Sequence, residues 1–177
     1  QLTMRVAQRL YENGYITYMR TDSVTLSSSA IEAARASAKS LYGADYVPPT
    51  PRVYEGKSKN AQEAHEAIRP AGDTFKTPGE LAPELSRDEF ALYDLIWKRT
   101  VASQMSDAKK MQMRVDFDVE TKSGQAAIFR ANGSVVTFPG FLAAYDEITE
   151  DKSGEESAVE SDRRLPAMKV GDSMKVN

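Results

Sequence analysis

The sequence predicts an α+β fold in which a mainly helical part, residues 1–107, is followed by an antiparallel β-rich segment, residues 108–177. Apolar residues recur every three or four positions in several segments before residue 107, which is the spacing of an amphipathic helix. Beyond residue 107, apolar and polar residues alternate, as they do in a half-buried strand. This change of period places the boundary between the two parts near Ala108.

Two helices are predicted before the first proline-rich stretch. The first covers Thr3–Asn13 and stops before Gly14, a residue type that commonly ends a helix. The segment from Tyr15 to Ser23 is too short and too mixed to predict either a helix or a strand. The second helix covers Ser28–Tyr42. Its expected buried residues are Ile31, Ala34, Ala38 and Leu41.

A capping box marks the start of the most regular predicted helix, Arg87–Met105. Ser86 and Glu89 stand three residues apart, so each side chain can bond the backbone N–H near the other. The expected core face of this helix consists of Phe90, Tyr93, Trp97 and Val101. Before it, Tyr46–Lys59 contains three prolines and is predicted to be extended or looped. Asn60–Ile68 is predicted to form a short helix.

The β-rich segment is predicted to contain several short strands. Met111–Val119 alternates apolar and polar residues and reads as a half-buried strand. Gln125–Arg130 and Ser134–Phe138 are predicted to be two further strands, joined by a hairpin turn at Asn132-Gly133. A last short strand is predicted over Ser173–Val176.

The composition excludes several classes of protein. Hydrophobic residues make up 41% and charged residues 28%, and no apolar run is long enough to span a bilayer, so we expect a cytoplasmic protein without membrane contact. The sequence has no cysteine, and His65 is its only histidine. A disulfide framework, a thiolate zinc site and an imidazole-rich metal centre are therefore excluded. Because the chain starts at Gln1 with a helical pattern already running by Thr3, we expect a fragment of a longer polypeptide.

Tyr18 and Arg20 have the most direct chemical interpretation. A phenol with a reference pKa of about 10 is a poor nucleophile until it is deprotonated, but it leaves far more easily than an alkoxide. Tyrosine therefore suits a phosphodiester that is cut and resealed through a covalent protein link, without ATP. In an extended segment Arg20 falls on the same side as Tyr18, where its guanidinium can hold the phosphate. The alternative is that Tyr18 packs into the core while Arg20 reaches solvent.

Longer motifs around these residues resemble a known family. Gly14–Ser23 is similar almost residue for residue to the active-site segment of the bacterial type IA DNA topoisomerases. Gln8–Tyr11 resembles the helix that leads into it, and Asn60–Pro70 resembles a second block that lies beside the nucleophile. The likeness is close over Thr3–Met105 and more general in the β-rich part. It implies a helical, winged-helix-like active-site domain followed by part of the β-rich arch that lets the gate open.

The resemblance implies roles for five residues. Tyr18 matches the nucleophile that forms a 5′-phosphotyrosyl link, and Arg20 matches the residue that contacts the scissile phosphate. His65 matches a histidine beside the active site, with a structural role in its loop as the alternative. Asp22 is expected near the DNA, orienting Arg20 or His65, or else capping the next turn. Arg69 is expected to touch the DNA backbone, or else to brace its loop.

The resemblance also implies cofactors and partners. Within this fragment no metal site is expected; the Asp and Glu residues of 147–162 read as a solvated run. In the full-length enzyme, Mg²⁺ is expected to be bound by a separate Toprim domain of the same polypeptide. The expected substrates are single-stranded DNA and negatively supercoiled duplex DNA, which the whole enzyme relaxes. Since residues 1–110 carry 15 basic against 14 acidic side chains and residues 111–177 carry 8 against 12, DNA contact is expected in the first part.

Two other classes of function compete with this interpretation: a different tyrosine transesterase, such as a relaxase or a tyrosine recombinase, and a DNA-binding module. A relaxase needs a histidine-rich metal motif, which one histidine cannot provide, and a tyrosine recombinase has its tyrosine late in the chain. A winged-helix DNA-binding module without catalysis needs a basic recognition helix, and none of the three helices predicted most firmly is strongly basic.

Overall fold

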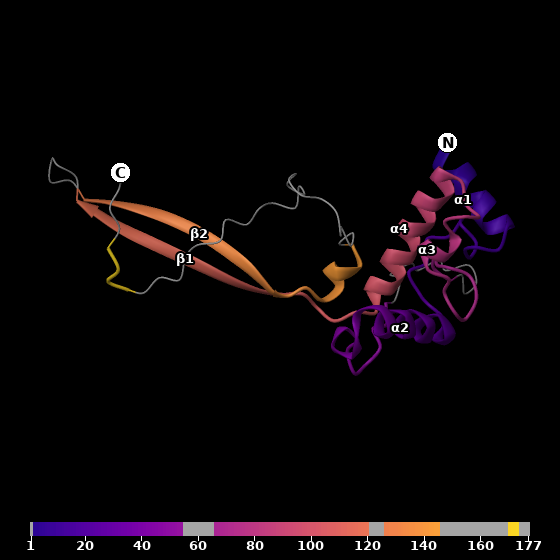
Figure 1. Ribbon diagram of the computed structural model, residues 1–177, viewed down its shortest axis with the longest axis horizontal. Coiled ribbons are helices and arrows are strands. Elements are labelled where there is room, and N and C mark those ends of the chain that lie inside the picture. Colours follow the sequence, from indigo (N-terminus) through magenta and orange to yellow (C-terminus); the bar gives the residue numbers. More distant parts are fainter. Residues whose placement is uncertain (1, 55–65, 121–125, 146–169, 174–177) are drawn as a thin grey trace. The chain divides into compact units, whose positions relative to one another are not determined.

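The computed structural model describes residues 2–54, 66–120, 126–145 and 170–173. These residues divide into two compact units. One contains the described residues within 1–107 and 140–147, and the other contains those within 108–139 and 148–177. The first unit is helical and the second contains a long antiparallel strand pair (Figure 1). This arrangement confirms the predicted α+β class.

The helices of the first unit follow the predicted order. Their bounds are α1 Leu2–Glu12, α2 Ser28–Tyr42, α3 Pro78–Leu81 and α4 Arg87–Ser103, with 3₁₀ turns η1 Ala44–Tyr46 and η2 Gly140–Ala144. The three longer helices confirm the predictions, including the capping box between Ser86 and Glu89. The short helix α3 was not predicted, because a single turn shows no periodicity. Its start is nevertheless marked in the sequence by a second capping box, between Thr77 and Glu80.

The core of this unit is built around one face of α4. Tyr93, Trp97 and Val101 are buried there, as predicted, and Leu10 of α1 joins the same hydrophobic cluster, whereas Phe90 is only half-buried. The buried face of α2 differs from the prediction, since Leu41 is 51% exposed. The residues actually buried on α2 are Ala30, Ala33, Ala34 and Ala38. The next residue on this buried stripe, four positions after Ala38, is the partly buried Tyr42. Leu41 therefore lies outside the stripe.

The second unit pairs β1, Lys109–Glu120, with β2, Ala126–Phe138, along their whole length (Figure 1). The prediction of two strands around an Asn132-Gly133 turn is wrong. Asn132 pairs with Arg114 and Gly133 pairs with Met113, so a single strand runs through both residues. An Asn-Gly pair favours a turn only locally, and here the long partner strand holds it in the ladder.

The strand pair shows the predicted alternation on β1. Met113, Val115 and Phe117 are half-buried, whereas the residues between them are exposed. Large apolar side chains nevertheless remain at the surface, among them Ile128 at 68% and Phe129 at 62% exposure. Within the described residues, β1 and β2 pair only with each other, and an isolated pair of strands buries little of its own apolar surface.

Gly140 begins η2 in a conformation that only glycine accepts readily. Its φ is +52°, and a Cβ there would lie 2.5 Å from backbone atoms of Ser106 and Asp107. We therefore expect Gly140→Ala to lower the free energy of unfolding by about 1–3 kcal/mol. The matched control is Gly79→Ala in α3, where an added Cβ would meet no atom within 4 Å and φ is not in the left-handed region. Urea unfolding of both variants measures the free energy of unfolding. An equal loss in the two variants would contradict the prediction for Gly140.

Some predictions fall wholly or partly outside the described residues. Residues 60–65 of the short helix predicted over Asn60–Ile68 lie outside them, and the described residues 66–68 are not helical. Ser173 is not in a strand, and the rest of the last predicted strand lies outside the described ranges. Among the helices that the structure describes, none combines the length and apolar character needed to cross a membrane.

Candidate active site around Tyr18

The segment that carries Tyr18 is held by backbone pairing with a distant part of the chain. Ile16 and Pro70 form an antiparallel β-bridge. The Thr17 amide donates to the Arg69 carbonyl at 2.9 Å, and the Ala71 amide donates to the Tyr15 carbonyl at 2.9 Å. The first segment singled out in the sequence, 14–23, therefore lies beside the described end of the second, residues 66–70.

Thr17 strengthens this junction through its side chain. Its hydroxyl donates to the Ala67 carbonyl at 2.8 Å and accepts from the Arg69 amide at 2.9 Å. One hydroxyl thus satisfies two backbone groups of the other segment, neither of which has a partner in a helix. The residue directly before Tyr18 is in consequence fixed in position.

Exposure alternates between successive residues from Tyr18 to Asp22, whereas Ile16, two residues before Tyr18, is buried. Ile16 and Met19 are buried, at 2% and 8% exposure, whereas Tyr18 is 42% exposed. Arg20 and Asp22 are exposed as well. The alternative in which Tyr18 packs into the core is therefore wrong. The observed pattern agrees with an extended segment that presents Tyr18, Arg20 and Asp22 to solvent.

Tyr18 is exposed but touches one other aromatic ring. The rings of Tyr11 and Tyr18 make an edge-to-face contact, with centroids 5.3 Å apart and planes at 73°. Tyr11 belongs to the last turn of α1 and is itself 42% exposed.

Arg69 is buried at 7% exposure, and its guanidinium points into the protein. It binds both carboxylate oxygens of Glu66, at 2.8 and 2.9 Å, and donates to the carbonyls of Pro70 and Gly72, each at 2.8 Å. Its charge also lies 5.9 Å from the centroid of the Phe75 ring. Four of the five guanidinium donors are thus used inside the protein. This geometry agrees with the alternative in which Arg69 braces its loop. It leaves no pair of guanidinium N–H groups free to bind a phosphate.

Glu66 connects this brace to the second helix. Its carboxylate accepts from the Ser27 amide at 2.9 Å, and Ser27 is the N-cap of α2. Burial alone would raise the pKa of Glu66, but hydrogen bonds from Arg69 and Ser27 and the charge of Arg69 hold it below 4.5. The ionised carboxylate therefore ties residues 66–72 to the start of α2.

The lowered pKa of Glu66 gives a pH dependence of stability. Ionised Glu66 stabilises the fold above its ordinary pKa of 4.5, and this contribution is lost as the pH falls through the lower folded-state pKa. We expect Glu66→Gln to have a lower free energy of unfolding than the unaltered chain near neutral pH. In acid, the free energies of unfolding of the two proteins are expected to become similar. Urea unfolding between about pH 3 and about pH 7 checks this, and a difference that does not change with pH would contradict it.

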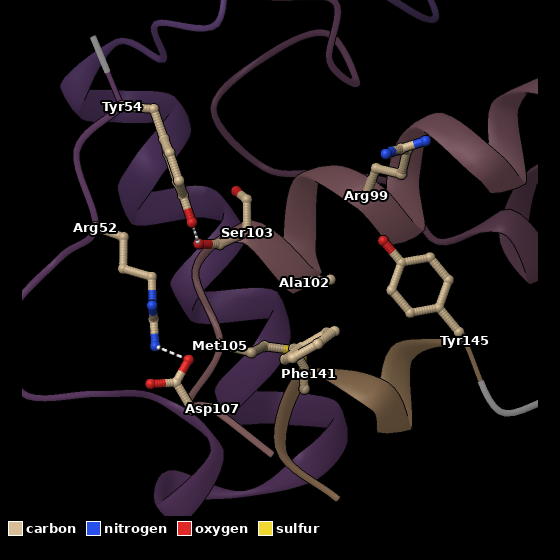
Figure 2. Close-up of a pocket in the computed structure, with 9 residues that line it drawn as sticks. All are labelled: Arg52, Tyr54, Arg99, Ala102, Ser103, Met105, Asp107, Phe141 and Tyr145. Carbon is tan, nitrogen blue, oxygen red and sulfur yellow. Dashed lines mark hydrogen bonds and ion pairs between the residues drawn. The ribbon is translucent and has the colours of Figure 1, made fainter.

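A pocket of about 280 Å³ lies elsewhere in the helical unit (Figure 2). Within it, Arg52 donates to the Asp107 carboxylate at 2.9 Å and the Tyr54 hydroxyl donates to the Ser103 carbonyl at 3.2 Å. The remaining lining residues are Arg99, Ala102, Met105, Phe141 and Tyr145. None of the predicted site residues that the structure describes lines this pocket.

Comparison with known proteins decides the family. A model of the DNA topoisomerase family matches residues 1–177 of this sequence. The chain belongs to the bacterial type IA DNA topoisomerases. It is 58% identical over 169 residues to DNA topoisomerase 1 of Mycolicibacterium smegmatis, covering 96% of this chain and 18% of that protein. DNA topoisomerase 1 of Synechococcus elongatus is 57% identical over 172 residues, covering 96% of this chain and 18% of its own length.

A solved structure agrees with this assignment to the topoisomerases. Full-length topoisomerase I from Thermotoga maritima matches with a TM-score of 0.61 and 36% identity, covering 86% of this chain and 24% of that one. The chain therefore spans about a fifth of the length of the topoisomerases that it matches.

The predicted site residues of this topoisomerase chain are placed unevenly. Tyr18, Arg20 and Asp22 lie on one exposed segment, and Arg69 braces the segment beside it. His65 lies outside the described residues. Next to Asp22, the hydroxyl of Thr21 accepts from the Ser23 amide at 3.0 Å. Both roles expected for Asp22, near the DNA or capping the next turn, remain predictions.

Sequence reasoning did not single out two residues that contact the candidate site residues of this topoisomerase chain. Glu66 anchors Arg69, and Tyr11 contacts Tyr18. Both lie within motifs that were quoted for other reasons. The spacing of Glu66 and Arg69, three residues apart with opposite charges, was the available signal for the first. The local sequence did not indicate that Tyr11 contacts Tyr18, because Tyr18 lies beyond the end of the helix.

The described part of this topoisomerase chain does not bring acidic side chains together as a metal site. Among these residues, no group of three or more His, Cys, Asp or Glu side chains could hold a metal ion. A donor set for Mg²⁺ is therefore not found in the described part.

Proposed function

We propose that this chain carries the nucleophile of a type IA topoisomerase and that Tyr18 is that nucleophile. The observation that supports this most directly is that Tyr18 is 42% exposed while Ile16 and Met19, on either side of it, are buried. A nucleophile must reach its substrate and still be held in a fixed place, and this segment meets both requirements.

The proposed step is a transesterification. The deprotonated phenol oxygen of Tyr18 attacks a backbone phosphorus of single-stranded DNA and forms a new P–O bond. The bond from phosphorus to the 3′-oxygen breaks, and that oxygen takes up a proton to become a free 3′-hydroxyl. The reverse step restores the strand, so bond energy is kept and no nucleotide is consumed. Passage of another strand between the two steps would relax negative supercoils.

Arg20 is proposed to hold the phosphate while charge builds on its non-bridging oxygens. Among the described residues, the structure gives Arg20 no ion-pair partner, so its guanidinium remains available for an anion. Asp22 and His65 are proposed to lie near the same DNA strand, with Asp22 orienting Arg20 or His65. Arg69 is proposed to brace the segment in place of contacting DNA.

Arg20→Ala is expected to slow strand cleavage by about 10²- to 10³-fold without unfolding the protein. Arg20 is exposed, so its loss removes little packing. Arg20→Lys is expected to cleave at a rate between those of Arg20→Ala and the unaltered protein, because an ammonium keeps the charge but cannot make a bidentate contact. Single-turnover cleavage of a labelled oligonucleotide measures the rate, and the exposed Arg87→Ala is the matched control. A normal cleavage rate for Arg20→Ala would remove Arg20 from the mechanism.

The rest of the polypeptide completes the proposed enzyme. We propose that it supplies the acidic ligands for Mg²⁺ and that the complete protein acts on the DNA of the bacterial cytoplasm. The substrate is proposed to be single-stranded DNA or negatively supercoiled duplex DNA.

The polarity of the covalent link tests the function. The full-length protein that contains this chain is incubated with a single-stranded oligonucleotide labelled at either its 5′ or its 3′ end, and then denatured. A 5′-phosphotyrosyl link predicts that the 3′ label stays with the protein. The released 5′-labelled fragment should end in a 3′-hydroxyl that a polymerase can extend. Retention of the 5′ label would instead indicate a 3′-phosphotyrosyl enzyme and overturn the proposal.

A further inference from the structure

We propose that Tyr11 is a positioning residue for Tyr18, which rests on the proposed role of Tyr18 as the nucleophile. Its ring makes the edge-to-face contact with Tyr18 at 5.3 Å between centroids and 73° between planes. This geometry is one that aromatic pairs prefer, because the positive edge of one ring meets the negative face of the other. A phenol that is 42% exposed would otherwise sample several side-chain rotamers.

The ring of Tyr11 is carried by a well-anchored helix. On α1, Val6, Ala7 and Leu10 are buried in the core. Arg9 forms a 3.1 Å ion pair with Glu89 of α4. These contacts fix α1 against the longest helix of the unit, so the side chain at Tyr11 starts from a rigid backbone.

The chain between Tyr11 and Tyr18 is also fixed at both ends. Gly14, with a φ of +76°, closes α1 by donating its amide to the Tyr11 carbonyl at 2.9 Å. The Tyr15 amide donates to the Leu10 carbonyl at 2.9 Å. Thr17 is then held by its hydrogen bonds to Ala67 and Arg69. The two rings are therefore presented to each other by two anchored backbones.

This contact would restrict the direction of the Tyr18 phenol without touching the DNA phosphate. A positioning role needs the ring of Tyr11 and not its hydroxyl. It should affect the rate of the chemical step more than the affinity for DNA, because misplacing a nucleophile slows attack without removing a binding contact.

The test compares Tyr11→Phe, which keeps the ring, with Tyr11→Leu and Tyr11→Met, which remove it but retain good helix propensity. Each change is made in the full-length protein. Single-turnover cleavage of a single-stranded oligonucleotide at saturating protein gives the rate, and fluorescence anisotropy gives the Kd. Tyr145→Leu is the matched control, because Tyr145 is equally exposed, at 42%, and lines the separate pocket.

We expect Tyr11→Leu and Tyr11→Met to cleave about 3- to 10-fold more slowly, with Kd changed less than about 2-fold. Tyr11→Phe and Tyr145→Leu should cleave at close to the unaltered rate. Using two ring-free variants keeps the test decisive if one of them folds poorly. Cleavage at the unaltered rate by a folded ring-free variant would overturn the proposal. So would an equal loss in Tyr11→Phe, or a rise in Kd that accounts for the slower cleavage.

The proposed function and this inference fail in different ways. A covalent adduct formed by Tyr18→Phe would remove the nucleophile and the positioning role together. Loss of the adduct in Tyr18→Phe combined with an unaltered rate in Tyr11→Leu would remove only the positioning role.

Discussion

Tyr18→Phe is expected to abolish the covalent protein–DNA adduct and to lower strand cleavage by on the order of 10⁴-fold or more. The substitution removes only the hydroxyl that would form the new P–O bond. It keeps the ring that contacts Tyr11. Because Tyr18 is 42% exposed, the free energy of unfolding is expected to change by less than about 0.5 kcal/mol. Denaturing gels of labelled oligonucleotide and urea unfolding measure the two quantities.

Tyr15→Phe is the matched control for this result. Tyr15 lies in the same segment, and its hydroxyl donates to the Glu84 carboxylate at 2.9 Å. Loss of that hydroxyl removes a surface hydrogen bond but no proposed nucleophile, so the adduct should persist. An adduct that survives in Tyr18→Phe, or that disappears in Tyr15→Phe alone, would assign the nucleophile to another residue.

Arg69→Ala is expected to lower the free energy of unfolding by about 2–4 kcal/mol. The change leaves the carboxylate of Glu66 without its bidentate partner and the carbonyls of Pro70 and Gly72 without their donors. Glu66 keeps some contact with solvent, which places the loss below that of a fully buried pair. Cleavage is expected to fall as well, because residues 69–71 hold the segment of Tyr18.

A double-mutant cycle separates the ion pair from the rest of the brace. We expect Glu66→Gln combined with Arg69→Met to be less destabilising than the sum of the two single changes, because no unpaired charge remains. Urea unfolding of the four proteins measures the coupling. Arg5→Ala, an exposed arginine on α1, serves as the control and should have little effect. A loss for Arg69→Ala no larger than for Arg5→Ala would contradict the bracing role.

Local patterns in the sequence predicted much of the helical unit. The capping box of Ser86 and Glu89 and the spacing of Tyr93, Trp97 and Val101 set the start and the buried face of α4. Such signals work because their partners lie within one or two helical turns. Asn132-Gly133 shows where local signals fail, since the local preference for a turn was overridden by pairing with Arg114 and Met113 on the preceding strand.

In the candidate site too, some features follow from the local sequence and others only from the tertiary structure. By itself, the sequence indicated the family and singled out Tyr18, Arg20 and Asp22 as candidates, because one run of neighbouring residues carries all three. The structure then showed that these three side chains are exposed. Only the tertiary structure decided that Arg69 faces inward to Glu66 and that the ring of Tyr11 meets Tyr18. Those contacts depend on how residues 66–72 fold back beside 15–17 and on where α1 ends. A side chain that has several possible rotamers takes the one that the surrounding structure favours.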